Sequence, residues 1–147
     1  YHHFGDKKGL LAAVVEQIDN EMDCRLQAIS DNAEDPWEGF CSRCRAYLEM
    51  ALEPEFQRIV LRDAKAVLGG SSPESQRLCI DSMQRLIRNL IQQGIVDDAD
   101  PEGLASLIYG SLAEAAFWIA DGNESDKRLA QGITALNLLL RGLRRSD

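Results

Sequence analysis

A chain of 147 residues is long enough for one domain with a buried core. Hydrophobic residues make up 45% of it and charged residues 27%, a composition that excludes a disordered chain. The net charge of −8 excludes nucleic-acid binding over the general surface of this chain, because attraction to phosphate needs clustered lysine and arginine.

The cysteines give an indication of the cellular compartment. Four cysteines without the dense spacing of a secreted scaffold, in a chain without a recognisable signal peptide, indicate reduced thiols and a cytoplasmic protein. Cys41 and Cys44 would share one helix face, but zinc needs a second pair of ligands. Buried thiols are therefore favoured, with thiol or oxidant sensing left open. We expect no metal and no cofactor.

Apolar residues at helical spacing predict helices along the whole chain and no strand. Asp6 is placed to cap the first helix, and Pro36, Pro73 and Pro101 each follow an aspartate or serine that can cap a helix. The predicted fold class is all-α, a bundle of about six helices. The predicted helices cover residues 6–29, 36–52, 54–68, 73–93, 101–120 and 126–143.

The last two predicted helices differ from the others because they carry few charges. Glu114 is the sole charged residue between Gly103 and Ala120, and none lies between Ala130 and Leu140. Such helices need cover on nearly all sides, which the outer helices of a small bundle lack. We therefore expect the two helices to form a four-helix bundle with those of a second copy. The residues expected in this dimer interface are Leu104, Leu107, Ile108, Ser111, Leu112, Ala115, Leu129, Gly132, Ile133, Leu136 and Leu140.

No uninterrupted apolar stretch approaches the roughly 20 residues of a membrane-spanning helix. We therefore expect a soluble chain with no membrane partner.

The start of the chain carries a family resemblance. Tyr1, Phe4, Lys7 and Leu10 give the spacing Tyr-x-x-Phe-x-x-Lys-x-x-Leu. That pattern is similar to the junction between the DNA-recognition helix and the next helix in the tetracycline-repressor (TetR) family.

Two further stretches resemble the same family. Residues 54–69 resemble the sixth helix of many TetR-type ligand-binding domains, with Lys65 in place of a proline and Gly70 in place of a tryptophan. Residues 110–116 are similar to a Gly-x-x-x-Glu-Ala segment of the eighth helix. The resemblance implies helices four to nine of the family fold.

This resemblance implies a division of the chain and a function. Residues 1–5 would end the recognition helix of a helix-turn-helix that lies upstream, and residues 6–147 would form the ligand-binding and dimerisation domain. The implied function is a ligand-responsive transcriptional regulator, usually a repressor. It would act as a homodimer on operator DNA, and an unknown small-molecule effector would shift the first long helix and release the DNA.

The resemblance also implies two groups of site residues. Contacts with DNA phosphate are expected from Tyr1, His3, Lys7 and Lys8, since a helix start and cationic side chains favour an anion. An effector pocket is mostly apolar with a few polar groups, although any single candidate of this kind is more often plain core. These candidates are Phe40, Cys44, Tyr47, Met83, Leu86, Asn89, Glu114 and Trp118.

The sequence holds no nucleophile elbow, phosphate-binding loop or metal-binding pattern, so no enzyme is expected. Two alternatives stay open at this point. The chain could be a helical protein-interaction module without DNA binding, or a small-molecule-sequestering module of the same fold.

Overall fold

The computed structural model describes residues 6–146 and confirms the all-α fold class. Among these residues, β-type pairing is limited to an isolated antiparallel bridge between Val96 and Arg144. The elements in chain order are α1 (Lys7–Asp31), α2 (Pro36–Met50), η1 (Phe56–Ala64), α3 (Lys65–Leu68), α4 (Pro73–Gln92), α5 (Pro101–Ala120) and α6 (Ser125–Arg141).

The starts of four helices follow the capping chemistry expected from the sequence. In each, the side chain before the helix accepts a hydrogen bond from the backbone N–H three residues later, which satisfies a donor that the helix itself leaves unpaired. A proline opens three of these helices, where its missing N–H costs nothing. The capping residues are Asp6, Asp35, Ser72 and Asp100, with distances of 2.8, 3.2, 3.1 and 2.8 Å.

Residues 54–68 are helical, as predicted, but most of this helix is not of the α type. Residues Phe56–Ala64 form a π-helix, whose hydrogen bonds join residues five apart, and the chain returns to α-helix only at Lys65–Leu68. The wider turn buries Phe56, Val60 and Leu61 together. Apolar residues four or five apart suit either kind of helix, so the sequence pattern did not separate them.

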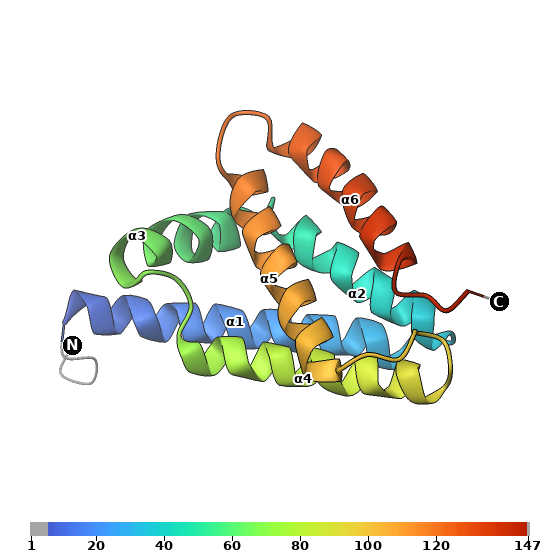
Figure 1. Cartoon of the computed structure of the whole chain (residues 1–147). Helices are drawn as coiled ribbons and strands as arrows, with labels where there is room; N and C mark the ends of the chain where they lie inside the picture. The colour runs from blue at the N-terminus through green and yellow to red at the C-terminus, as the bar shows by residue number, and fades with distance from the viewer. Residues whose placement is uncertain (1–5, 147) are drawn as a thin grey trace.

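Figure 1 shows how the helices are arranged. Helices α1 and α4 run along one edge of the molecule, and α5 crosses over them. Helix α2 packs against α1, α5 and α6, while η1 lies against α1. The centre of the core comes largely from α2, which contributes the fully buried Phe40, Cys44 and Leu48.

The C-terminal residues pair with the turn that follows α4. Besides the bridge, the Asp97 N–H donates to the Leu143 carbonyl at 3.0 Å, and the Arg145 N–H donates to the Ile95 carbonyl at 2.8 Å. These bonds fix the end of the chain beside the start of α5.

Helix α5 is apolar over most of its length, although two glutamates interrupt the apolar run. By length and composition alone, this helix could cross a membrane, with a mean hydropathy of 1.3 over its most apolar window. Glu102 and Glu114 lower that average only slightly. The protomer buries 28% of this apolar window. Packing within one copy therefore leaves much of the α5 surface uncovered.

A buried polar network joins three helices. The Arg43 side chain on α2 is 3% exposed and donates to Ser82 Oγ on α4 at 3.2 Å and to Gln27 Oε1 on α1 at 3.3 Å. Ser82 also donates to Gln27 at 3.0 Å, and Asp23 Oδ1 lies 3.8 Å from the guanidinium. A buried cation with these partners fixes the register of the three helices.

We expect Arg43→Met to lower the free energy of unfolding by about 2–4 kcal/mol, because it leaves Asp23 without its counter-ion and removes one of the two donors to Gln27. Urea denaturation followed by circular dichroism measures this. The matched control is Arg45→Met, which removes a half-exposed ion pair with Glu38 and should cost less than about 1 kcal/mol. Equal losses in the two variants would show that the network is not specially stabilising.

Candidate functional site

A cavity of about 420 Å³ lies among α1, α2, η1, α4 and α5. Its size falls in the usual range of small-molecule pockets. One end is formed by the turn at Gly69–Ser71 and the beginning of α4. Its apolar walls come from Met22, Phe56, Val60, Leu61, Ile80, Ala113 and Phe117.

Asp19 on α1 supplies the single ionisable carboxylate among the residues that line this cavity, and no lysine or arginine lines it. The Asp19 Oδ2 atom is buried and has no hydrogen-bond partner. Burial raises the pKa of Asp19 to about 6, although a hydrogen bond from the Ser71 side chain to the carboxylate lowers it. At neutral pH the cavity therefore holds an ionised carboxylate without a counter-ion, an arrangement that is costly to the fold and typical of functional sites.

Two phenols add hydrogen-bonding groups to the same cavity. Tyr47 on α2 and Tyr109 on α5 both line it. Burial raises the pKa of Tyr109 to about 12 and moves that of Tyr47 far above its usual value, and the charge of Asp19 contributes to both shifts. Both side chains remain neutral at physiological pH and can donate or accept a hydrogen bond.

The structure places some of the predicted pocket residues around this cavity. Tyr47 lines it, and Cys44 and Met83 line a void of about 20 Å³ that also borders on Tyr47 and Tyr109. Phe40 is buried in the core, and Leu86 packs against the core without lining any of these spaces.

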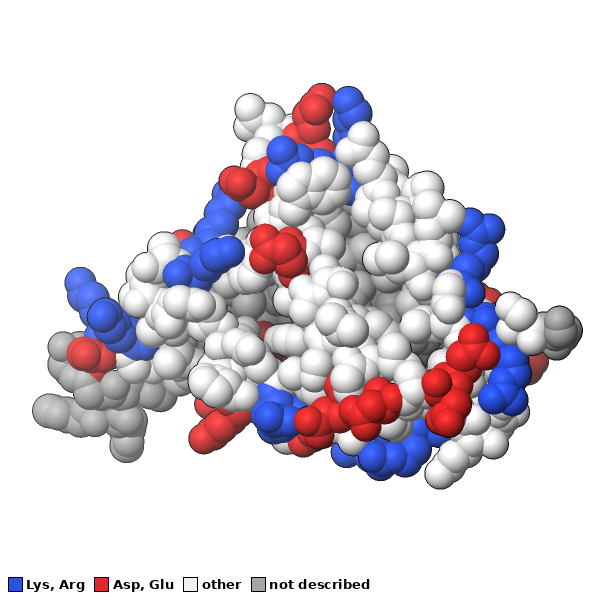
Figure 2. Space-filling model, in the orientation of Figure 1, with Lys and Arg blue, Asp and Glu red and all other residues white. Residues whose placement is uncertain are grey.

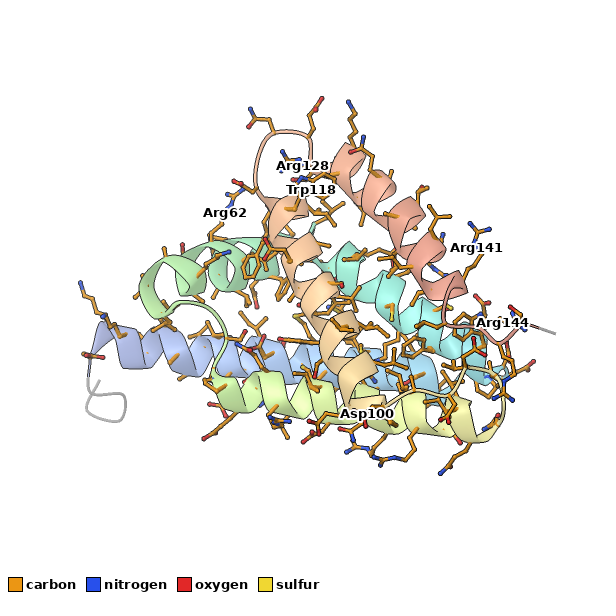
Figure 3. All side chains as sticks on the ribbon, viewed as in Figure 1. Arg62, Asp100, Trp118, Arg128, Arg141 and Arg144 are labelled. Carbon is orange, nitrogen blue, oxygen red and sulfur yellow. The ribbon has the colours of Figure 1, made fainter. Side chains whose placement is uncertain are left out.

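The other predicted pocket residues lie elsewhere. Glu114 and Trp118 line a surface hollow of about 400 Å³ between α5 and the η1–α3 segment. Figure 3 shows Trp118 beside Arg128, whose guanidinium lies 5.1 Å from the indole ring. Asn89 is exposed, and its side chain accepts a hydrogen bond from Gln93. The eight residues therefore do not converge on one site.

Sequence reasoning missed Asp19, although a signal was present. Val15, Ile18, Met22 and Leu26 form the buried stripe of α1, and Asp19 lies four residues after Val15 and three before Met22. That spacing puts its carboxylate on the apolar face of the helix.

The paired cysteines of α2 are protonated at neutral pH. Burial raises the pKa of Cys41 to about 11 and that of Cys44 to about 12. Since the thiolate is the reactive form, both side chains act here as buried apolar groups.

Figure 2 shows a white, uncharged area between α5 and α6, with an acidic patch over α5 beside it and further acidic and basic residues around it. Leu107 is 71% exposed and Leu139 is 64% exposed. A shallow groove of about 190 Å³ crosses this surface, which we call the α5–α6 face. The groove is lined by Leu104, Leu107, Ile108, Ser111, Leu136, Leu139, Leu140 and Leu143.

The residues predicted for a dimer interface fall into two groups. Leu112, Leu136 and Leu140 are buried within the protomer itself, and Gly132 lies close to Ile119 of the same chain. The rest are half-buried or exposed on the two helices, namely Leu104, Leu107, Ile108, Ser111, Ala115, Leu129 and Ile133.

At the other end of the molecule, Lys7 and Lys8 form the exposed first turn of α1. The phosphate contacts expected from Tyr1 and His3 lie outside the described residues.

Comparison with known proteins gives the family. Residues 37–143 match the family described as "Tetracyclin repressor-like, C-terminal domain". The chain is also 78% identical to a TetR-family transcriptional regulator of Pectobacterium atrosepticum, with a TM-score of 0.97 over 99% of this chain and 76% of that one. The chain belongs to the TetR family of transcriptional regulators.

A more distant TetR-family structure shows the same fold. The TetR-family regulator of Syntrophomonas wolfei superposes with a TM-score of 0.73 at 16% identity, over 94% of this chain and 74% of that one. No curated protein shows a significant match to the chain.

For this TetR-family chain we expect Asp19→Asn to raise the free energy of unfolding at about pH 7.5 by about 1–3 kcal/mol. The folded-state pKa of about 6 lies above the ordinary value of 3.8, so the ionised carboxylate destabilises the fold. The penalty is absent below pH 3.8, grows between the two values and is complete above pH 6.

Urea denaturation at about pH 7.5 and pH 4 measures the difference between the variant and the wild type. Glu21→Gln removes the same charge from an exposed position of α1 and should have little effect at either pH. A gain for Asp19→Asn that is equally large at pH 4 would contradict an electrostatic origin.

Proposed function

We propose that residues 6–147 are the ligand-binding and dimerisation domain of a ligand-responsive repressor that acts on operator DNA in the cytoplasm. The observation that carries this proposal is the double role of α1. The middle of this helix lines the cavity with Asp19 and Met22, and its first turn carries Lys7 and Lys8. At 1.5 Å per residue, Asp19 lies about 18 Å from Lys7 along the helix axis.

A ligand in the cavity would act on α1 through its neighbours. The walls opposite α1 include η1 and the turn at Gly69 and Gly70, whose φ angles are +83° and +119°. π-helical segments are rare and concentrate at functional sites. A ligand that binds more tightly when these walls are displaced would favour a second position of α1, and so shift the population of dimer geometries.

The dimer is proposed to form through the α5–α6 face. An exposed apolar surface across two helices is typical of an interaction site, and a two-fold axis would pair it with the same surface of a second copy. Helix α5 lines the cavity through Tyr109 and Ala113 and carries Leu107 on the exposed face. The cavity would then lie between the DNA-directed helix and the dimer interface.

The DNA contacts are proposed at the start of the chain. Lys7 and Lys8 would meet phosphate together with Tyr1 and His3, with residues 1–5 as the end of a recognition helix. The first turn of α1 favours an anion through its free N–H groups as well as through its lysines. The proposed function is binding, with no catalytic step.

We expect Leu107→Glu and Leu139→Glu each to raise the dimer dissociation constant at least roughly a hundredfold, because each buries an unpaired charge in the interface. Sedimentation velocity of the purified chain measures this. Both side chains are exposed in the protomer, whereas a charge at Leu136 would also disturb its own core.

The control is Leu78→Glu, at a leucine of α4 that is also exposed but lies away from the α5–α6 face. This variant should sediment as the wild type does. A wild-type chain that is monomeric, or interface variants that remain dimeric, would remove the proposed interface.

A compound that raises the melting temperature of the chain is expected to weaken operator binding by the intact regulator, because it stabilises a dimer with α1 displaced. Thermal-shift screening identifies the compound, and a gel-shift assay measures the DNA affinity. The Lys7→Ala/Lys8→Ala variant should lose DNA affinity and keep the thermal shift. A stabilising compound that leaves DNA binding unchanged would contradict the repressor mechanism.

A further inference from the structure

We infer that the cavity binds an organic cation, an ammonium-type group on an aromatic or aliphatic body, with Asp19 as its counter-ion. This inference rests on the function proposed above and names the chemical class of the effector.

The first argument is the contrast between two acidic residues one turn apart on α1. Each of the two has one buried carboxylate oxygen without a hydrogen bond, but Asp23 Oδ1 lies 3.8 Å from the Arg43 guanidinium, so the chain supplies its own counter-ion there. Asp19 faces a cavity whose lining contains no basic residue, and its Oδ2 atom is buried without a hydrogen-bond partner. A buried carboxylate normally has a cationic or hydrogen-bonding partner. At Asp19 a ligand can fill that role.

The second argument concerns the rest of the cavity wall. Four aromatic rings line it, and the faces of aromatic rings attract cations. One of these rings already binds a cation of the chain, since Lys65 Nζ lies 3.8 Å from the centroid of Phe117. Lys65 itself lines the neighbouring surface hollow. The four rings are those of Tyr47, Phe56, Tyr109 and Phe117.

The third argument is the set of neutral polar groups in the cavity wall. Ser71, Ser75 and Gln76 come from the turn and the start of α4, and Ser106 comes from α5. Their oxygens can accept hydrogen bonds from those ammonium N–H groups that do not bond to Asp19. An anionic ligand would meet the Asp19 charge with no basic residue in the cavity lining to offset it.

The position of Asp19 would also connect the cation to regulation. A cation drawn to Asp19 acts on the middle of α1, the helix that begins with Lys7 and Lys8. The charge of the ligand would thus be recognised on the element whose movement is proposed to release DNA.

The test uses three compounds with one carbon skeleton: 4-phenylbutylammonium, 4-phenylbutanol and 4-phenylbutanoate. Isothermal titration calorimetry on the wild-type chain at about pH 7.5 gives their dissociation constants. We expect the ammonium compound to bind roughly tenfold to a hundredfold more tightly than the alcohol, as for a hydrogen bond to a charged group, and the carboxylate to bind most weakly.

Two variants locate the origin of this preference. Asp19→Asn should reduce the ratio between the alcohol and ammonium dissociation constants to near one. Glu21→Gln removes an equal charge from the exposed side of α1 and should leave the ratio unchanged. Circular dichroism confirms that each variant is folded.

The pH dependence gives an independent readout. Affinity for the ammonium compound should fall as the pH is lowered from about 7.5 to 5, because Asp19 becomes protonated near pH 6, while affinity for the alcohol stays constant. The ionisable groups that face Asp19 from the other helices are Tyr47 on α2, Cys79 on α4 and Tyr109 on α5. Burial raises the pKa of each of them, so all three stay neutral across this range.

Three results would overturn the inference: an ammonium compound that does not bind, one that binds no better than the alcohol or the carboxylate, or a preference that survives Asp19→Asn. The proposed function fails differently. If the alcohol or carboxylate binds best and still releases DNA from the intact regulator, the charge assignment is wrong and the ligand-responsive repressor stands. If the ammonium compound binds as expected and DNA is not released, the cavity selects cations without the proposed regulation.

Discussion

The structure depends on the packing of one face of α1. Val15, Ile18, Met22 and Leu26 bury this face against the rest of the bundle, and the same face carries Asp19. The helix must therefore anchor the core while it holds an ionised group at the edge of that core. The bundle meets both demands by packing tightly around the Arg43 network and leaving a cavity beside Asp19. A chain optimised for stability alone would not carry the Asp19 charge at this position. A charged group that lowers the stability of the fold is typical of binding sites.

Much of the fold was predictable because it is determined locally. Capping by Asp6, Asp35, Ser72 and Asp100 depends on residues within one turn of each helix, so the sequence located those helix starts closely. The π-helix was not predictable in this way. Its register depends on how Phe56, Val60 and Leu61 pack against α1 and α5, and these contacts are distant in sequence.

The site was less predictable because five separate segments build it. Glu114 is the sole charged residue between Gly103 and Ala120, yet it is exposed, since much of the apolar surface of α5 faces outward. Asp19 lies in a helix with many charged residues, and its sequence neighbours do not distinguish it from the exposed ones. How deeply a carboxylate is buried depends on the face of the helix that carries it. The sequence also does not show which leucines of the expected interface are exposed. Leu136 and Leu107 both lie in apolar helices, but only Leu136 is buried within its own protomer.

The pairing of the C-terminal residues with the turn after α4 has a mechanical consequence. Hydrogen bonds between residues 95–97 and 143–145 join the two ends of the segment that contains α5 and α6, and Arg128 closes its far end by donating to the carbonyls of Trp118 and Asp121. Hydrogen bonds thus hold α5 and α6 together at both ends as one helical hairpin. A tilt imposed on α5 from the cavity would carry α6 along with it, so that a partner resting on this hairpin would reorient as a whole.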